Sequence, residues 1–440
     1  MAVLIRDADV LDLSGLRKNS NIFVDDGRIV QVSSDIPAFS KIDYVIEGKG
    51  KLAIPGLINA HVHTEETLFA NSIPDTANHI EWFQNYALPY YGALTQEDAY
   101  WSTLFSQALM LMHGVTCYAD SANLWPLADA KAAERCGIRA FIGMWNCDLN
   151  TPFARPTDKC LEQMENLLRK LSKSTKVRAI ASLIGVNTCS DELYKGTIAL
   201  AKKHKTLATS HEASGHEDVV KCVKRTGKRP IEHLASIGFL TRQTLISHAT
   251  DLSDKEVRLI KANDCAIAAC PVTELKKGKG LWKFGKLVQL ISSNVRICVG
   301  TDNANSSNNF DPIKSALFLS LLAKDYALNP SIVNARSAFC FLTKCASDIF
   351  SLNTGVLQPN FIADLVLLEK EPFLLFGDPY QALLFCDQPK IDLVMVGGEV
   401  VYLNGKLLKI DFNEVLKEVE KRSQRIAKRV LDHGHCKNCS

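Results

Sequence analysis

Eight short apolar segments recur along the middle of the chain, and longer stretches with helical spacing separate them. The segments span 52–61, 115–119, 139–145, 177–186, 206–211, 244–249, 265–270 and 295–301. Leu104, Ala108 and Leu111 illustrate the intervening pattern, since spacings of three and four residues place side chains on one helix face. Buried strands that alternate with helices pair in parallel. The sequence therefore predicts an α/β fold with a (β/α)8 TIM-type barrel.

The two chain ends have a different texture from the middle. Both contain short alternating strands joined by turn residues, and Asn404-Gly405 is a strong signal for a type I′ hairpin. We expect residues 1–54 and 357–440 to form one small β-sandwich domain beside a barrel of residues 55–356. The charged, amphipathic segment 411–433 predicts a surface helix, which we expect to pack on the β domain.

Composition narrows the classes of function. The chain has 440 residues, 47% hydrophobic and 22% charged, and a formal net charge of +3. This balance gives no case for a nucleic-acid or membrane-surface partner. The Lys-rich stretch 276–279 predicts a solvated loop rather than an anion site. The 14 scattered cysteines and the lack of an apolar leader or an 18-residue apolar run indicate reduced, buried cysteines and a cytoplasmic location.

Potential metal ligands stand at the ends of several apolar segments. His61 and His63 close the first segment, and their two-residue spacing places both imidazoles on one face of a strand. His211 and Asp302 follow later segments. Catalytic residues of such barrels sit at the carboxyl ends of the strands. The strand-end positions therefore make His61, His63, His211, His248 and Asp302 candidate metal ligands. The terminal Cys-x-x-Cys at 436–439 is not expected to bind a native metal.

His248 lies between a strand and a helix, which is where functional groups occur in this architecture. Ser253 and Glu256 form the predicted capping box at the start of that helix. After Asp302, the segment from Asn303 to Asn309 is rich in small polar residues and predicts a loop near a ligand. We assign a functional role to His248 and a substrate contact to Asn303.

At these positions the chain resembles the amidohydrolase superfamily. The likeness is closest to the branch of cytosine, guanine and thiomethyladenosine/adenosylhomocysteine deaminases and triazine (atrazine-type) hydrolases. It runs nearly end to end, and the matching stretches are 55–63, 188–190, 248–256, 270–271 and 300–302, together with Trp82. The split β domain is also a trait of this family.

The resemblance implies roles for these residues. His61, His63, His211 and Asp302 would hold one metal ion, with zinc favoured over iron. Asp302 would move protons as a catalytic residue. His248 would polarise the attacked centre, and Trp82 would contact a small heterocyclic substrate. Family analogy also suggests a homodimer or a larger homo-oligomer.

Three positions depart from the family pattern. Ser214 stands where a glutamate usually protonates a ring nitrogen, Ile184 replaces a common histidine, and Ala70 replaces an arginine. All three are substrate-facing positions in the family. The metal-binding positions of this sequence therefore match the family pattern, while the substrate-facing positions depart from it. The missing proton could come from Glu212, Glu217, Glu65 or Glu66. Glu212 and Ser214 are included among the expected substrate contacts.

The leading hypothesis is a metal-dependent aminohydrolase. Metal-bound hydroxide would attack an amino-substituted purine, pyrimidine, pterin or triazine, and ammonia would leave. The alternative is hydrolysis of a halogen or alkylamine substituent, or of a cyclic amide, at the same metal. A third hypothesis is a catalytically silent metal-binding scaffold, against which the complete ligand set argues.

Overall fold

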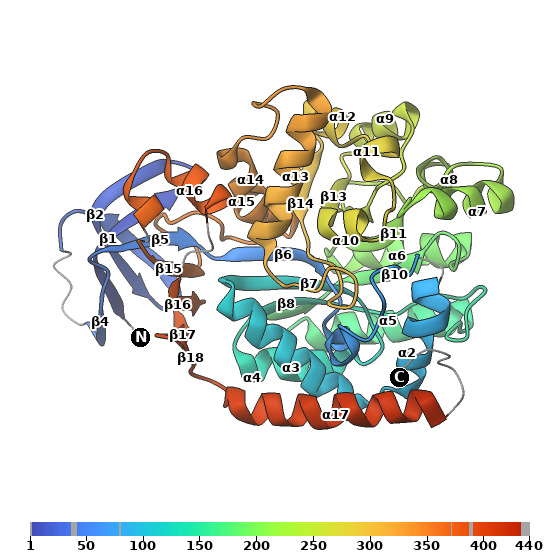
Figure 1. Cartoon of the computed structure of the whole chain (residues 1–440), viewed down its shortest axis with the longest axis horizontal. Coiled ribbons are helices and arrows are strands. Elements are labelled where there is room, and N and C mark those ends of the chain that lie inside the picture. The colour runs from blue at the N-terminus through green and yellow to red at the C-terminus, as the bar shows by residue number, and fades with distance from the viewer. Residues whose placement is uncertain (1, 37–41, 79–80, 371, 387–389, 433–440) are drawn as a thin grey trace.

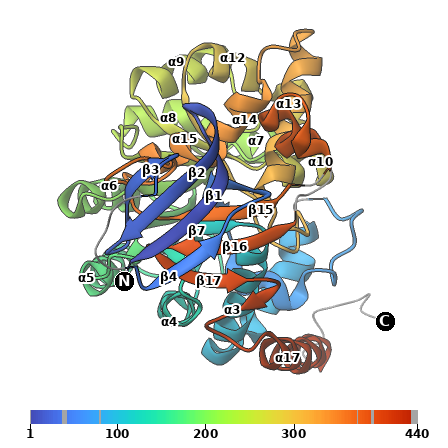
Figure 2. The ribbon, with the colours of Figure 1, turned by 90° about the vertical axis from the view of Figure 1, so that its left-hand side faces the viewer.

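The computed structural model describes residues 2–36, 42–78, 81–370, 372–386 and 390–432. Within this part of the chain, strands from both ends form one sheet, and the middle of the chain forms parallel strands surrounded by helices (Figure 1). Figure 2 shows the sheet of the chain ends in front, with β1 and β2 beside β15, β16 and β17. The site described below depends on how these two parts meet.

The chain ends build one nine-stranded sheet in the order β18-β17-β16-β15-β5-β1-β2-β3, with β4 paired to β1. Its strands are β1 Val3–Asp12, β2 Gly15–Asp25, β3 Arg28–Ser33, β4 Tyr44–Glu47, β5 Lys51–Pro55, β15 Leu365–Glu369, β16 Ile391–Val396, β17 Glu399–Leu403 and β18 Lys406–Leu407. Asn404 and Gly405 both have positive φ, of 50° and 81°, between the last two strands. The predicted type I′ turn is therefore confirmed.

The middle of the chain builds two parallel sheets, in the orders β6-β7-β8-β9 and β10-β11-β12-β13-β14. The strands are β6 Leu57–Val62, β7 Val115–Asn123, β8 Arg139–Met144, β9 Val177–Ala179, β10 Ala181–Gly185, β11 Ala208–Glu212, β12 Thr244–His248, β13 Ala266–Ala269 and β14 Arg296–Val299. Most of their side chains are buried, as expected for parallel strands covered by helices.

Backbone hydrogen bonds join the two parallel sheets at both edges. Between β9 and β10, the Ile180 N–H donates to the Ile142 carbonyl at 3.0 Å. Beyond β14, the Thr301 and Asp302 N–H groups donate to the His61 carbonyl of β6 at 3.1 and 2.9 Å. The second junction brings the last strand of the series beside the first.

Two predicted strands are interrupted in the structure. The segment 52–61 was expected to be one strand, but it divides at Gly56 into β5 of the nine-stranded sheet and β6 of a parallel sheet. A Cβ at Gly56 would lie 2.1 Å from Thr116 Oγ1, so glycine permits this close passage. The segment 177–186 divides at Ile180 because its halves pair with different neighbours.

Helices connect and cover the strands. They are η1 Thr64–Phe69, η2 Trp82–Ala87 (a π-helix), α2 Leu88–Ala93, α3 Gln96–Met112, α4 Pro126–Cys136, α5 Thr157–Leu171, α6 Asp191–His204, α7 His216–Thr226, α8 Pro230–Ser236, α9 Asp254–Ala262, α10 Pro271–Lys276, α11 Leu281–Phe284, α12 Leu287–Ser292, α13 Pro312–Ala327, α14 Ala335–Leu342, α15 Lys344–Ile349, η3 Pro372–Leu375, α16 Pro379–Phe385 and α17 Phe412–Asp432. The predicted Ser253–Glu256 capping box begins α9 and is confirmed.

Helix α17 packs against α3, and not against the nine-stranded sheet as expected from the sequence (Figure 1). Arg422 of α17 donates to the fully buried Asp98 of α3 at 3.0 Å, and the Phe412 and Phe105 rings stack. Asp98 also completes the capping box of α3 with Thr95. A buried carboxylate on α3 thus determines where the helix docks.

The cysteines are mostly free and buried. Ten described cysteines are unpaired, but Cys340 and Cys345 form a disulfide with Cα atoms 5.3 Å apart. The expectation of reduced cysteines throughout is wrong for this pair, because the junction of α14 and α15 brings the two within bonding geometry. Among the helices described, none has the length and apolar character to cross a bilayer. The Cys-x-x-Cys at 436–439 lies outside the described residues.

Candidate metal centre

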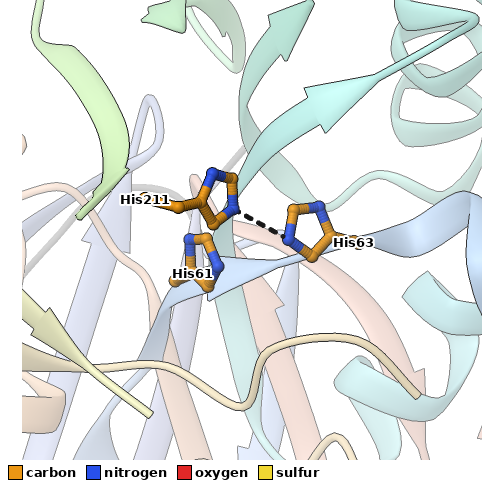
Figure 3. A group of neighbouring side chains, drawn as sticks. All are labelled: His61, His63 and His211. Carbon is orange, nitrogen blue, oxygen red and sulfur yellow. Dashed lines mark hydrogen bonds between the residues drawn. The ribbon is translucent and has the colours of Figure 1, made fainter. Parts of the chain in front are cut away.

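The predicted ligands lie at the carboxyl ends of parallel strands. His61 belongs to β6 and His63 follows it directly, while His211 belongs to β11 and His248 ends β12. Asp302 comes shortly after β14, where its N–H binds the His61 carbonyl. Because the strands are parallel, these ends meet at one edge of the sheets, and the imidazoles of His61, His63 and His211 point toward one another (Figure 3).

Three distances between candidate ligand atoms are close to those of a tetrahedral ion. His63 Nε2 lies 3.2 Å from His211 Nε2 and 3.4 Å from Asp302 Oδ1. His61 Nε2 lies 3.5 Å from Asp302 Oδ1. Zinc bonds of about 2.0–2.1 Å in tetrahedral geometry separate neighbouring ligand atoms by about 3.3–3.4 Å. The ligand atoms form two overlapping clusters, His61 with His63 and His211, and His61 with His248 and Asp302, so His61 is common to both.

The imidazoles are also oriented for metal binding. His61 Nδ1 lies 3.0 and 2.9 Å from the Ser121 and Ser247 hydroxyls, and its buried Nε2 has no hydrogen-bond partner. His211 Nδ1 donates to the Ile184 carbonyl at 2.8 Å. Such contacts at one ring nitrogen leave the lone pair of the other free for a metal. The unpartnered Nε2 atom is what an ion would satisfy.

The charge states match this donor set. Burial lowers the pKa of His63 well below its usual value and the pKa of His211 to about 3. Both rings are therefore neutral at pH 7. For Asp302, burial alone would raise the pKa, but the close approach of His61 and the nearby His248 hold it well below its usual value. Neutral imidazoles with one carboxylate are the ligands that zinc prefers.

The backbone is strained where the strands end. Ala213, His248 and Asp302 adopt the left-handed region, with φ of 49°, 74° and 59°. Non-glycine residues occupy this region at a cost of about 1–3 kcal/mol, and such residues cluster at functional sites. At Gly300 a Cβ would lie 2.7 Å from the His61 Cβ, so only glycine allows β14 to approach β6 this closely.

His248 is paired with a carboxyl that sequence reasoning missed. His248 Nδ1 lies 3.3 Å from Glu274 Oε1, and both side chains are buried. Burial lowers the pKa of His248 well below its usual value and raises the pKa of Glu274 to about 8. The pair therefore carries no net charge at pH 7 and can accept or donate a hydrogen bond toward the metal centre.

A chain of hydrogen bonds runs from Trp82 to a second buried carboxyl. The Trp82 Nε1–H donates to Asn305 Oδ1 at 2.8 Å, and the Asn305 amide donates to Glu66 Oε2 at 2.6 Å. The Tyr91 hydroxyl donates to the other oxygen of Glu66. Burial raises the pKa of Glu66 well above its usual value. Nearby, Asn303 Oδ1 is buried without a hydrogen-bond partner, so it could contact a substrate.

Three of the four expected proton donors are not placed for that role. Glu212 follows His211 on β11 and points to the opposite face, where Ser210 and the Tyr194 hydroxyl donate to it. The prediction that Glu212 contacts substrate is therefore wrong, because strand side chains alternate. Glu65 accepts from the Leu124 and Trp125 N–H groups, and Glu217 is exposed.

Ser214 is buried beside the loop after β11, where its N–H donates to Asp218 at 3.3 Å. Sequence reasoning missed Glu274, Lys277 and Lys279, and it named Asn305 only within the polar segment 303–309. Glu274 lies in helix α10 after β13, the two lysines follow that helix, and Asn305 lies in the loop after β14. The only signal for these residues in the sequence is their position shortly after two of the predicted strand segments, 265–270 and 295–301.

Parallel strands that converge on a buried set of three histidines and one aspartate define a metallohydrolase type of site. The family model for the amidohydrolase family matches residues 52–401, which is most of the chain. The chain therefore belongs to the amidohydrolase family, and it is a hydrolase of carbon–nitrogen bonds.

Curated relatives match over nearly the whole length. The chain is 29% identical over 428 residues to a 5'-deoxyadenosine deaminase of Methanococcus aeolicus, covering 95% of this chain and 97% of that protein. It is 30% identical over 402 residues to a 5-methylthioadenosine/S-adenosylhomocysteine deaminase of Pyrococcus furiosus, covering 90% and 94%.

Solved structures share the fold. An adenosine deaminase from Xanthomonas campestris with bound zinc superposes with a TM-score of 0.90 at 20% identity, covering 97% of this chain and 98% of that one. Atrazine chlorohydrolase from Arthrobacter aurescens TC1 with zinc superposes with a TM-score of 0.87 at 20% identity, covering 96% of this chain and 100% of that one. The match to these structures covers the chain-end sheet as well as the parallel strands.

Proposed function

We propose that this protein is a metal-dependent aminohydrolase that removes the amino group from a nitrogen heterocycle. The observation that carries the proposal is the convergence of His61, His63, His211 and Asp302, in which three pairs of ligand atoms lie 3.2–3.5 Å apart. The deaminase names of the relatives support the reaction and point first to adenine nucleosides.

Finer features belong to the same proposal. We propose zinc as the ion, because the donor set and distances suit it. We also propose that the two parallel sheets form one (β/α)8 barrel of residues 55–356. Residues 1–54 and 357–440 would form the β-sandwich domain, except that α17 lies on the barrel side. A homodimer or larger homo-oligomer and a cytoplasmic location complete the proposal, and the ten free cysteines support the location.

The mechanism assigns a proton task to each side chain. A bound zinc ion would lower the pKa of water from about 15.7 toward 7 and so supply hydroxide at neutral pH. Asp302 accepts the proton of the attacking water and returns it to the departing amine. His248, held by Glu274, donates or accepts a hydrogen bond at the attacked centre. The substrate amine leaves as ammonia, and the ring keeps the water oxygen.

Glu66 is our candidate for the proton donor that the family places at the Ser214 position. It is buried, burial raises its pKa well above the usual value, and Asn305 and Tyr91 fix its two oxygens. A protonated carboxyl can donate to a ring nitrogen while water attacks the neighbouring carbon. We expect Glu66→Gln to lower kcat by about 10²–10⁴-fold, as loss of a general acid does.

The second candidate is hydrolysis of a halogen or alkylamine substituent, or of a cyclic amide. Ser214 favours it, because these leaving groups need ring protonation less than an amine does. The two candidates differ in product, since only the first releases ammonia from every substrate.

The test is ammonia release by the zinc-loaded protein from 5'-deoxyadenosine, methylthioadenosine, adenosylhomocysteine, guanine, cytosine, pterins and triazines. Activity that Asp302→Asn abolishes and His204→Ala retains would support deamination, since His204 lies at the end of α6, outside the ligand cluster. Chloride or amine release without ammonia would favour the second candidate. No product with full zinc loading would favour a silent scaffold.

A further inference from the structure

A lysine-rich segment after α10 lies beside the metal centre. The sequence predicted that residues 276–279 form a solvated loop, but Lys277 is only 8% exposed. Its N–H donates to the Thr273 carbonyl and the Lys279 N–H donates to the Glu274 carbonyl, both at 2.9 Å. Because Glu274 holds His248, the segment is anchored to the functional side chains. The prediction of a solvated loop is therefore wrong for Lys277.

We call the two lysines Lys277 and Lys279 of this segment the lysine pair. Lys277 Nζ lies 5.7 Å from the centre of the Trp82 ring, whose indole N–H binds the Asn305 side chain. A Cβ built at Gly215 would lie 3.7 Å from the Lys279 side chain. Gly215 directly follows Ser214, so the Lys279 side chain lies along the loop where the family glutamate is missing.

Within the described residues, neither member of the lysine pair forms a salt bridge. Burial lowers the pKa of Lys277 to about 8, although the nearby Asp302 and Asp75 act to raise it. After burial, the positive charge of Lys279 is the next largest cause of the lowered pKa of His248. Burial raises the pKa of Glu274 to about 8, so this neighbouring carboxyl is mostly uncharged at pH 7. Two cations held beside a metal centre without a partner attract a negatively charged group.

We propose that the lysine pair binds an anionic substituent, a phosphate or a carboxylate, on the heterocyclic substrate. This inference rests on the proposed function, because it assigns the substrate class of the same site. Lysine binds such groups as a compact charge with three donors. The anion would occupy the side of the site formed by Trp82 and Gly215, and the amino-bearing ring would face Asp302.

The kinetic test compares adenosine, adenosine 5'-monophosphate and adenosine 5'-carboxylic acid with the zinc-loaded enzyme. We expect kcat/KM to be at least 10-fold higher for one anionic substrate than for adenosine. Lys279→Met should lower that value at least 10-fold and abolish the preference for the anionic substrate over adenosine. Lys195→Met is the matched control, since Lys195 is an exposed lysine on α6. The two anions distinguish a phosphate from a carboxylate subsite.

A binding test separates this inference from the proposed function. Inosine and inosine 5'-monophosphate lack the amino group, so calorimetry with them measures recognition without turnover. Tighter binding of the monophosphate by at least 10-fold, lost in Lys279→Met, supports the lysine pair even if no deamination occurs. Retention of the preference in Lys279→Met would show that the metal alone binds the anion and would overturn the proposal. Equal binding of the two ligands by the wild type would also overturn it, even in an active deaminase.

Discussion

At the scale of single residues, His61 connects the metal centre to the strands on either side of it. Its Nδ1 contacts hydroxyls on β7 and β12, its carbonyl accepts two N–H groups from the segment after β14, and its Nε2 faces the other ligands. A single side chain thus fixes both the geometry of the site and the contact between the first and last parallel strands. This double role explains why Gly300 must lack a side chain beside it.

Replacing His61 should empty the metal site. We expect His61→Ala to reduce zinc from one ion per chain to less than about one-tenth, because three ligands without a fourth hold the ion poorly. The measurement is the metal content of purified protein after dialysis. His204→Ala should keep its zinc, because His204 is not part of the ligand cluster. Full zinc content in His61→Ala would contradict the assignment.

Glu212 gives a second prediction at this scale, and it concerns stability. Burial raises its pKa to about 8 from an unfolded value of about 4.3, so the folded protein holds a proton that the unfolded chain releases. The contribution of this proton to the free energy of unfolding is fully present below about pH 4. It is lost as the pH rises to about 8, by at most about 1.4 kcal/mol per pH unit.

Glu212→Gln should therefore flatten the pH dependence of the free energy of unfolding between about pH 5 and pH 8. Urea denaturation at several pH values measures this slope, and Glu192→Gln at an exposed position of α6 is the control. An unchanged slope in Glu212→Gln would show that the carboxyl is ionised in the folded protein.

The sequence predicts the metal ligands better than the residues around them. His61, His63 and His211 could be found because their side-chain type and strand-end position each indicate a metal. Glu274 and Lys277 could not, because their roles arise from burial and from loop paths that bring them to His248 and Trp82. Glu212 was misassigned because it directly follows the ligand His211 in a strand, and neighbouring side chains of a strand point to opposite faces.

At the scale of helices and strands, the apolar segments predict where parallel strands occur but not where they change partners. Gly56 and Ile180 divide two predicted strands, and neither interruption breaks the apolar pattern. The apolar pattern also does not predict where α17 docks. Its amphipathic spacing indicates that one face of the helix is buried, but it does not indicate which element covers that face. The contacts that fix this docking include the ion pairs of Asp98 with Arg422, Arg425 and Arg429, which are distant from it in sequence.

Arg422 provides the test of this docking. Arg422→Met should lower the free energy of unfolding by about 2 kcal/mol, because hydrogen bonds to buried charged groups contribute about 1.5–3 kcal/mol. Lys421→Met, at a side chain that is 69% exposed, should change it by less than about 0.5 kcal/mol. Urea denaturation measures both. Equal stabilities would show that the Arg422–Asp98 ion pair does not stabilise the docking of α17.

At the scale of the whole molecule, the nine-stranded sheet and the parallel strands share one continuous piece of chain. β5 pairs with β1 from the start of the chain and with β15 from near its end, and it runs through Gly56 directly into β6. The strand that carries His61 is thus the extension of a strand held by both chain ends. The sequence indicated a sheet from both ends, but not this direct connection.

Gly56 is therefore a sensitive point between the two parts. Gly56→Ala would place a Cβ within 2.1–2.7 Å of the Thr116 side chain, and we expect it to lower the free energy of unfolding by about 1–3 kcal/mol. The matched control is Gly92→Ala in α2, where a Cβ meets no atom within 4 Å and helix propensity favours alanine. A Gly56→Ala protein as stable as wild type would mean that Thr116 yields easily.

The position of β5 between β1 and β15 has a consequence for synthesis on the ribosome. A growing chain makes β5 and the His61 strand early, whereas β15 begins only at Leu365. Until then, one edge of β5 presents unpaired N–H and C=O groups, the kind of edge at which chains associate. A polypeptide that ends before Leu365 would already contain every metal ligand, yet it would carry an open sheet edge next to them. The emergence of β15 is what closes that edge.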